Sequence, residues 1–395
     1  MINLKNKVNK EKKRYKHVKK NPIKIGIIAT IVIAIVIMIA MYISNESFRN
    51  IIDRYVLQKE ATENNVATIK IDSEANPMIY AYDKYITVLN RNVMQVYSSG
   101  GKKEGEIDIA ISNPIYSSNN RFLAVAEQDG RKIYLVSGQN IIWQQEVDGQ
   151  IYRMNVNKNG YISIAVSQTS YKTVIITFDP NGKELFKTYL STTYAIDTDI
   201  SNDNKYLAVA EVDSTGSMIK SKIKIISIEQ AQNTPSDSII YTYSADANDI
   251  VSNIKYQDRN KLVCMYDNKI QIIENNQSTV LTEMDDSVLF ADINLSGHVA
   301  KISKKATALF MANSEVSIIN LDTNKENLYA IEGTPKDIHC YENTVAVNLG
   351  TEVHFISNNG WLIKKYLSSQ EVKDVVLGGN LAGIVYKDKI EIVSI

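Results

Sequence analysis

Residues 114–130 read PIYSSNNRFLAVAEQDG, and residues 198–214 read TDISNDNKYLAVAEVDS. Each stretch contains a short strand-like run, a polar turn rich in Ser and Asn, and then the run Leu-Ala-Val-Ala-Glu. Residues 154–168, MNVNKNGYISIAVSQ, have the same layout. Short runs of apolar and β-branched residues between such turns are typical of β-strands. The repetition predicts an all-β fold built from copies of one unit.

A second repeated piece follows the first. It consists of a strand, a Gly or Asn turn and a strand carrying a large aromatic residue, and it occurs at 132–147, 174–190 and 353–367. The aromatic residue is Trp143, Phe186 or Trp361, and we expect Trp143 and Trp361 to pack one unit against the next. The two pieces together supply four strands per unit, with a mean spacing of about 42 residues. This arrangement predicts a β-propeller.

Eight blades can be placed along the chain. They start near Pro77, Ser112, Ile151, Ala195, Ile250, Ser287, Pro335 and Val372. The last unit supplies three strands, and we expect residues 66–72 (VATIKID) to add the fourth, because a strand from the other terminus would cover open sheet edges. A seven-bladed ring is the alternative, since three runs within residues 287–333 compete for two strand positions.

The repeats also resemble those of known propellers. The turn SNDNKYLAVA (201–210) and the hairpins GQNIIW (138–143) and NGKELF (181–186) are similar to the repeats of Tol-type, quinoprotein-like and WD40-like propellers. With its apolar N-terminal segment, the whole chain resembles uncharacterised membrane-anchored propeller families of Gram-positive bacteria. The resemblance covers roughly residues 66–395 and implies the fold, because such repeats serve many different functions.

The apolar segment at residues 25–43, IGIIATIVIAIVIMIAMYI, contains no charged residue. A helix of this length covers roughly 28 Å, close to the ~30 Å hydrocarbon core of a bilayer. Residues 1–24 hold ten basic residues and one acidic residue, and such a cluster beside a span stays cytoplasmic. We therefore predict a basic cytoplasmic tail (1–24), an uncleaved single-pass transmembrane helix (25–43) in the cell membrane, and an extracellular propeller (66–395).

A helical stalk is expected between the span and the propeller. From Phe48 onward, apolar residues recur at i, i+3, i+4, i+7 and i+8, which places them on one face of a helix over residues 46–60. The stalk as a whole is assigned to residues 44–65.

Signatures of catalysis are missing from the sequence. It contains no phosphate-binding glycine loop, no H-E-x-x-H and no G-x-S-x-G. Cys264 and Cys340 lie within apolar runs, which favours two buried thiols over a disulfide. Residues 25–395 hold 34 basic and 43 acidic residues, a balance that argues against nucleic-acid binding.

Metal ligands are not apparent either. His339 and His354 fall in one unit, but no carboxylate or thiol recurs around them at ligand spacing. Asp197, Asp199 and Asp203 lack the Gly and the distal Glu of a calcium loop. The sequence predicts no metal site, no bound cofactor and no catalytic residues.

A binding face is expected on the loops between the second and third strands of the blades, namely 127–132, 167–172, 213–222 and 304–314. The longest is DSTGSMIKSK within 213–222, and binding residues are often found on such loops. The candidate binding residues are Tyr171, Lys172, Asp213, Met218, Lys220 and Lys222.

The function expected from the sequence is that of a membrane-anchored extracellular propeller that binds a protein, a peptide or a wall glycan at the cell envelope without catalysing a reaction. The alternative is an envelope enzyme, either a quinoprotein-like oxidoreductase or a glycan-active lyase or hydrolase. Asp, Glu, His and Tyr side chains converging on one mouth of the ring would favour the enzyme, and an apolar or featureless mouth would favour binding.

Overall fold

The computed structural model describes residues 22–44, 48, 52, 56–57, 59–62, 66–246, 249–257, 261–305 and 313–395. The chain forms two compact units, Met1–Lys59 and Glu60–Ile395, which are considered separately.

The first unit contains helix α1 (Pro22–Ser44), which includes the segment predicted to span the membrane. Across the described residues, no helix is both long enough and apolar enough to cross a membrane. The tail (1–24) and the stalk helix (46–60) lie largely outside the described residues. The span, the stalk and the orientation of the chain therefore stay predictions.

The second unit is an all-β propeller, whose first four blades have four strands each. In chain order, they are β3 (Met78–Tyr82), β4 (Tyr85–Asn90), β5 (Val93–Tyr97), β6 (Lys103–Asp108); β7 (Pro114–Asn119), β8 (Phe122–Glu127), β9 (Lys132–Ser137), β10 (Asn140–Glu146); β11 (Gln150–Val156), β12 (Ile162–Gln168), β13 (Tyr171–Phe178), β14 (Glu184–Leu190); β15 (Tyr194–Ile200), β16 (Tyr206–Asp213), β17 (Lys220–Ser227) and β18 (Ile239–Ser244). A short helix, α3 (Ile228–Asn233), lies between β17 and β18.

The last four blades complete the ring. Their strands are β19 (Val251–Tyr256), β20 (Leu262–Tyr266), β21 (Lys269–Glu274), β22 (Gln277–Glu283); β23 (Val288–Asp292), β24 (His298–Lys304), β25 (Asn313–Asn320), β26 (Glu326–Glu332); β27 (Asp337–Tyr341), β28 (Thr344–Asn348), β29 (Glu352–Ser357), β30 (Leu362–Leu367); β31 (Asp374–Leu377), β32 (Leu381–Val385) and β33 (Lys389–Ser394).

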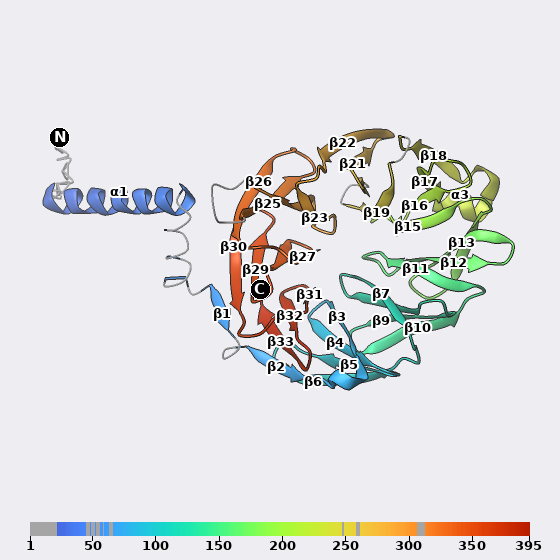
Figure 1. Ribbon diagram of the computed structural model, residues 1–395, viewed down its shortest axis with the longest axis horizontal. Coiled ribbons are helices and arrows are strands. Elements are labelled where there is room, and N and C mark those ends of the chain that lie inside the picture. Colours follow the sequence, from blue (N-terminus) through green and yellow to red (C-terminus); the bar gives the residue numbers. More distant parts are fainter. Residues whose placement is uncertain are drawn as a thin grey trace, which may run out of the picture. The chain divides into compact units, whose positions relative to one another are not determined.

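The described strands form eight sheets, so the eight-bladed prediction is confirmed and the seven-bladed alternative is wrong. Figure 1 shows the sheets arranged around a ring, with the first strand of each blade nearest the centre. The stretch that was difficult to assign, residues 287–333, contains all four strands of one blade. Two of the competing runs are β24 and β25. The third, residues 307–313, lies almost entirely outside the described residues.

Two N-terminal strands join the sheets of the last two blades. Strand β2 (Ala67–Lys70) pairs antiparallel with β33 and is the outer strand of the last blade, the position that the sequence assigns to residues 66–72. Strand β1 (Glu60–Thr62) pairs in parallel with β30 and makes the sheet of β27–β30 five-stranded. The helical prediction is therefore wrong at Glu60, where pairing with the edge of β30 satisfies backbone groups that a helix end would leave unpaired.

The apolar core lies between neighbouring blades. Strand β8 carries the sequence FLAVAE, in which the first five side chains are buried. Its residues Leu123 and Val125 pack in one cluster and Ala124 and Ala126 in another. Because each sheet is covered on both faces, a second strand such as β8 carries a continuous apolar run. This explains why Leu-Ala-Val-Ala recurs.

The repeated aromatic residues differ in their environments. Trp143 is buried and packs on Phe178 of the next blade, with 5.5 Å between ring centroids, and Phe186 is also buried. The predicted packing role is thus confirmed for Trp143. Trp361 is 44% exposed, because it lies in the turn before β30 and not within a strand.

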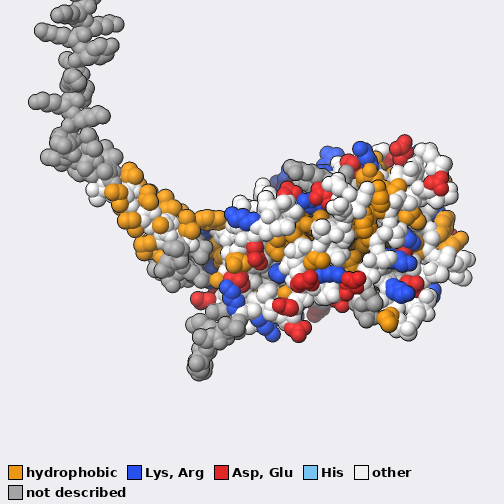
Figure 2. All heavy atoms as spheres, turned by 90° about the horizontal axis from the view of Figure 1, so that it is seen from above, with side chains coloured by type: hydrophobic (Ala, Val, Ile, Leu, Met, Phe, Trp, Pro, Cys, Tyr) orange, Lys and Arg blue, Asp and Glu red, His pale blue; other side chains and the backbone are white. Residues whose placement is uncertain are grey.

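The rim of the propeller carries exposed apolar side chains on several outer strands. They include Ile239 and Tyr241 on β18, Val280 on β22 and Leu328 on β26. These strands lie along the top of the ring in Figure 1, and Figure 2 shows apolar side chains on that side, interspersed with acidic and basic ones.

Candidate functional site at the channel mouth

A polar cavity of about 670 Å³ lies where the inner strands meet. It is lined by the inner strands and by the turns that join the first strand of a blade to the second, and we call it the channel mouth. Every blade contributes to its wall. One residue from each is Ala81, Tyr116, Asn155, Asn202, Lys255, Asp292, His339 and Val375.

Hydrogen-bonding side chains dominate the lining. Six asparagines are among the lining residues: Asn119, Asn120, Asn155, Asn202, Asn294 and Asn343. Three serines and the tyrosines Tyr116, Tyr256 and Tyr341 lie with them. Amides both donate and accept hydrogen bonds, and tyrosines add an apolar ring surface. The mouth therefore suits a polar ligand with some apolar surface.

Hydrogen bonds between turns of successive blades fix the rim of the mouth. Asp83 N–H donates to Asn120 O (3.2 Å), and Ser296 N–H donates to Glu342 O (2.6 Å). The Asn202 side chain donates to Gln257 O (3.2 Å). Since these bonds link neighbouring blades, the mouth is preformed, which reduces the entropy lost when a ligand binds.

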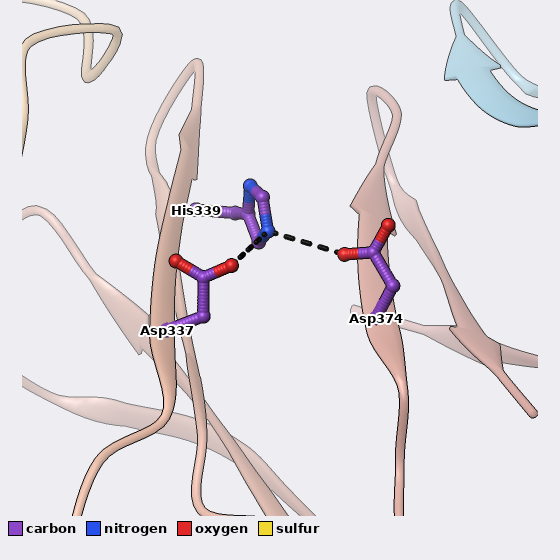
Figure 3. Close-up of side chains that lie close together, drawn as sticks. All are labelled: Asp337, His339 and Asp374. Atoms are coloured by element: carbon purple, nitrogen blue, oxygen red, sulfur yellow. Dashed lines mark ion pairs between the residues drawn. The ribbon is translucent and has the colours of Figure 1, made fainter.

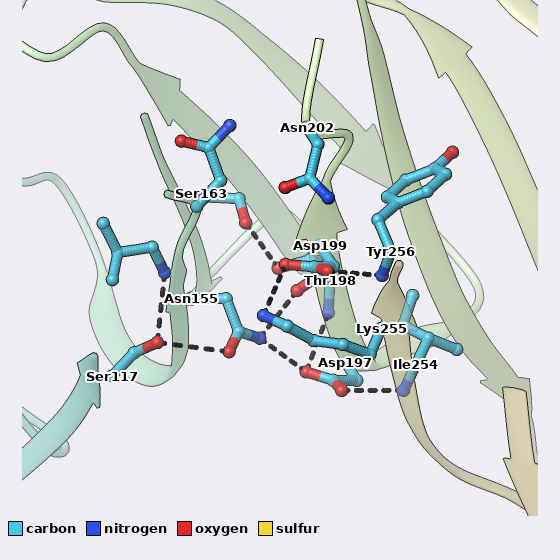
Figure 4. Close-up of polar contacts among 12 residues, drawn as sticks. Ser117, Asn155, Ser163, Asp197, Thr198, Asp199, Asn202, Ile254, Lys255 and Tyr256 are labelled. Carbon is cyan, nitrogen blue, oxygen red and sulfur yellow. Dashed lines mark hydrogen bonds and ion pairs between the residues drawn. The ribbon is translucent and has the colours of Figure 1, made fainter. Parts of the chain in front are cut away.

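Below the rim, buried carboxylates join the inner strands of successive blades (Figure 4). Asp197 Oδ2 accepts a hydrogen bond from Ile254 N–H (3.0 Å), and Asp199 Oδ2 accepts one from Tyr256 N–H (2.7 Å). Inner strands of adjacent blades belong to different sheets, so these side chains take the place of a backbone ladder. Two of the three aspartates considered for a calcium loop, Asp197 and Asp199, thus connect blades.

The same carboxylates are held by cations and amides from both sides. Arg153 Nε and Asn155 Nδ2 donate to Asp197 Oδ1 at 2.9 and 2.7 Å. Burial raises the pKa of Asp199, although Lys255 and the Tyr256 N–H oppose this effect. Burial likewise raises the pKa of the Tyr341 hydroxyl at the rim, which donates a hydrogen bond to Asn120 O (3.4 Å).

The candidate binding residues chosen from the sequence lie at the other end of the ring. Successive strands of a blade are antiparallel, so the loops between second and third strands emerge opposite to the channel mouth. Met218 is 52% exposed there, and Lys220 pairs with Asp213 across the loop. Lys172 Nζ donates to the Tyr194 hydroxyl (3.0 Å).

The candidate residues come from two successive blades. Lys222 lies beside Lys220 along β17, whereas Tyr171 packs on Tyr189 of its own blade, with 4.7 Å between ring centroids. Most of loop 304–314 lies outside the described residues. Binding on this end stays a prediction that the structure leaves untested.

Three chemically active groups meet on the channel wall (Figure 3). His339 Nε2 lies 3.1 Å from Asp337 Oδ2 and 3.3 Å from Asp374 Oδ1. Asp337 and His339 are two residues apart on β27 and so face the same side, and Asp374 begins β31 of the next blade. Burial disfavours protonation of His339, but Asp374, Asp337 and Asp292 outweigh burial and raise its pKa.

This cluster was not predicted, because the sequence shows no recurring ligands around the pair His339 and His354. His354 lies two strands away, on β29, where it contacts Glu352. A signal was nevertheless present, because Lys336-Asp337-Ile338 and Lys373-Asp374-Val375 repeat a Lys-Asp-aliphatic pattern at the start of two successive inner strands. Residues at equivalent positions of neighbouring blades lie close together in a propeller.

The two cysteines take no part in any such site. Cys264 and Cys340 are buried and free, as predicted. Burial raises the pKa of both thiols, so neither is reactive at neutral pH.

The fold and the polar channel mouth place this chain among the eight-bladed β-propellers. It belongs to a family of unknown function (DUF5711), whose model matches residues 57–395. A comparison with curated proteins gives no match.

Solved structures support the fold assignment. The chain is similar to BamB from Moraxella catarrhalis, with 10% identity and a TM-score of 0.50, over 84% of this chain and 99% of that one. It is also similar to Sqt1 from Chaetomium thermophilum, with 10% identity and a TM-score of 0.53, over 84% of this chain and 98% of that one. At this identity, the likeness concerns the fold alone.

Proposed function

We propose that this protein is a binding module of the bacterial cell envelope that holds a protein or peptide segment at the channel mouth. The observation that carries the proposal is the mouth itself, a preformed polar cavity to which all eight blades contribute. Its volume of about 670 Å³ falls within the roughly 300–1,000 Å³ typical of ligand sites. Amide side chains match the donors and acceptors of a peptide backbone.

The envelope location rests on the sequence. The basic tail and the uncharged segment 25–43 support a single membrane span with the N-terminus inside and the propeller outside. In this arrangement, the propeller presents its mouth to extracellular partners while the span keeps it at the membrane.

A second candidate function is an envelope enzyme, and one observation favours it. His339, Asp337 and Asp374 converge on the channel wall, which is the convergence expected of an active site. Binding is the better proposal because the buried carboxylates of the channel already have structural partners. Asp197, Asp199 and Asp292 accept hydrogen bonds from backbone N–H groups of neighbouring blades and so serve to join the blades. Turnover on wall glycans or alcohols that a single carboxylate substitution abolishes would support the enzyme instead.

The binding proposal can be tested by chemical crosslinking and capture from intact cells. A double variant, Asn294→Arg with Asn343→Arg, places two bulky charges at exposed positions of the mouth. Met218→Arg, at the opposite end, is the matched control. We expect the double variant to lose the partner and the control to retain it. A partner lost only with Met218→Arg would move the site to loop 213–222, and a captured wall glycan would replace the protein partner.

A further inference from the structure

The cluster of Asp337, His339 and Asp374 has the composition and spacing of a metal site. One oxygen or nitrogen atom from each residue lies within 4.8 Å of the other two. The imidazole nitrogen is 3.1 and 3.3 Å from the two carboxylate oxygens. A metal with bonds of about 2.0–2.2 Å places neighbouring ligands roughly 3.0–3.6 Å apart, so these distances suit three ligands of one ion.

A backbone N–H group holds each of the two carboxylates. Asp337 Oδ1 accepts a hydrogen bond from Ile338 N–H (2.7 Å), and Asp374 Oδ1 accepts one from Val375 N–H (2.7 Å). Each aspartate is thus held by the residue that follows it on an inner strand. Such support fixes ligand orientation before a metal binds.

The histidine nitrogen is not used by an ordinary hydrogen bond. Its Nε2 is buried between the carboxylates, yet it forms no hydrogen bond of normal geometry with any described residue. An ion between the three groups would satisfy the nitrogen lone pair and neutralise both carboxylates.

We propose that Asp337, His339 and Asp374 bind one divalent first-row transition metal on the channel wall. The set of one imidazole and two carboxylates suits zinc or manganese better than magnesium or calcium, which prefer oxygen ligands alone. The two carboxylates are about half exposed, at 47% and 52% of their side chains, which leaves coordination positions for water. This proposal does not depend on the partner proposed for the mouth.

A second histidine–carboxylate pair provides a matched control. His354 Nε2 lies 3.3 Å from Glu352 Oε2, but Lys365 Nζ lies 2.7 Å from the same oxygen. The ammonium group occupies the place that a cation would take. His354→Gln should therefore remove a histidine without affecting metal binding.

The test is calorimetric titration of the full-length, detergent-purified and chelator-treated protein, with a histidine-free tag, using zinc chloride as the probe. We expect one zinc ion per chain, and affinity at least ten-fold weaker in His339→Gln and in Asp374→Asn. The His354→Gln variant should bind as tightly as the wild type, and magnesium should not compete. Absence of binding, or equal weakening in all three variants, would overturn the proposal.

Cobalt supplies a second readout that does not require both variants to fold. Bound Co²⁺ absorbs visible light according to its ligands, and Asp374→Asn, which changes only one oxygen to nitrogen, should alter this spectrum. If either His339→Gln or Asp374→Asn fails to fold, the other variant still tests whether the metal binds at this cluster. A cobalt spectrum identical in wild type and Asp374→Asn would contradict the assignment.

Discussion

The carboxylate of Asp197 accepts a hydrogen bond from the backbone N–H of Ile254 at 3.0 Å, across 57 residues of chain and from one blade to the next. The same relationship joins Asp292 to Cys340 N–H at 2.8 Å. A propeller lacks backbone ladders between blades, so its inner ring needs other contacts to stay closed. Buried carboxylates supply them here, and they also shape the channel below the mouth.

Substituting Asp197 should therefore destabilise the propeller. Asp197→Ala leaves the buried Ile254 N–H without its acceptor and Arg153 without its partner, a loss of about 3 kcal/mol. Urea denaturation monitored by tryptophan fluorescence measures the change in the free energy of unfolding. Glu104→Ala, at an exposed position of β6, is the control and should have little effect. Equal effects of the two substitutions would show that the carboxylate does not join the blades.

Closure of the ring by β2 predicts a second effect on stability. Ile69 is 3% exposed and packs with Ile390 and Ile392. A chain beginning at Asn76 lacks β2, and it should melt at a lower temperature and less cooperatively than one beginning at Asn64. Differential scanning calorimetry on both chains compares them directly. Identical transitions would mean that the last blade is stable with three strands.

Stability should also depend on pH through Glu352. Its hydrogen bond with His354 and its contact with Lys365 lower its pKa to about 2, against the effect of burial. A carboxylate with a lowered pKa stabilises the fold above its unfolded value of about 4.3 and loses this contribution as the pH falls towards 2. In Glu352→Gln, the urea midpoint should change less between pH 4.5 and pH 2 than in the wild type. An unchanged slope would contradict this assignment.

Orientation in the membrane can be tested on whole cells. The charge of the tail predicts that protease added to cells stripped of their wall digests residues 44–395 and spares the tail. Antibodies against tags at each end of the chain report the outcome. Protection of the C-terminal tag in intact cells, with digestion only after lysis, would place the propeller inside and exclude extracellular partners.

Much of the fold could be predicted because it repeats. The runs at 114–130 and 198–214 encode the same pair of strands, and period-two patterns with Asn and Gly turns mark the others. Strand β1 could not be predicted, since Glu60–Thr62 is too short to show a period and its partner residues on β30 are about 300 positions away in sequence. The residue pattern within a short strand does not show which distant strand it will pair with.

The candidate site was harder to predict than the fold. The length of loop 213–222 favoured Met218 and its neighbours as binding residues. The cavity instead lies at the opposite end of the ring, among short turns such as the one that contains Asn343. The mouth is assembled from one to five residues of each of the eight blades, so no single stretch of sequence carries its signature. Asp337 and Asp374 become neighbours only because two blades are adjacent in the ring.

The central claim is that a partner binds at the channel mouth, and site-specific photocrosslinking in living cells tests it most directly. A photoreactive amino acid is placed at Lys158, Asn294 or Asn343 in the mouth. The control positions are Met218 at the opposite end of the ring and Val280 on the outer strand β22. We predict that irradiation gives one common adduct from the three mouth positions and none from Met218 or Val280. Adducts from Met218 or Val280, with none from the mouth, would contradict the account.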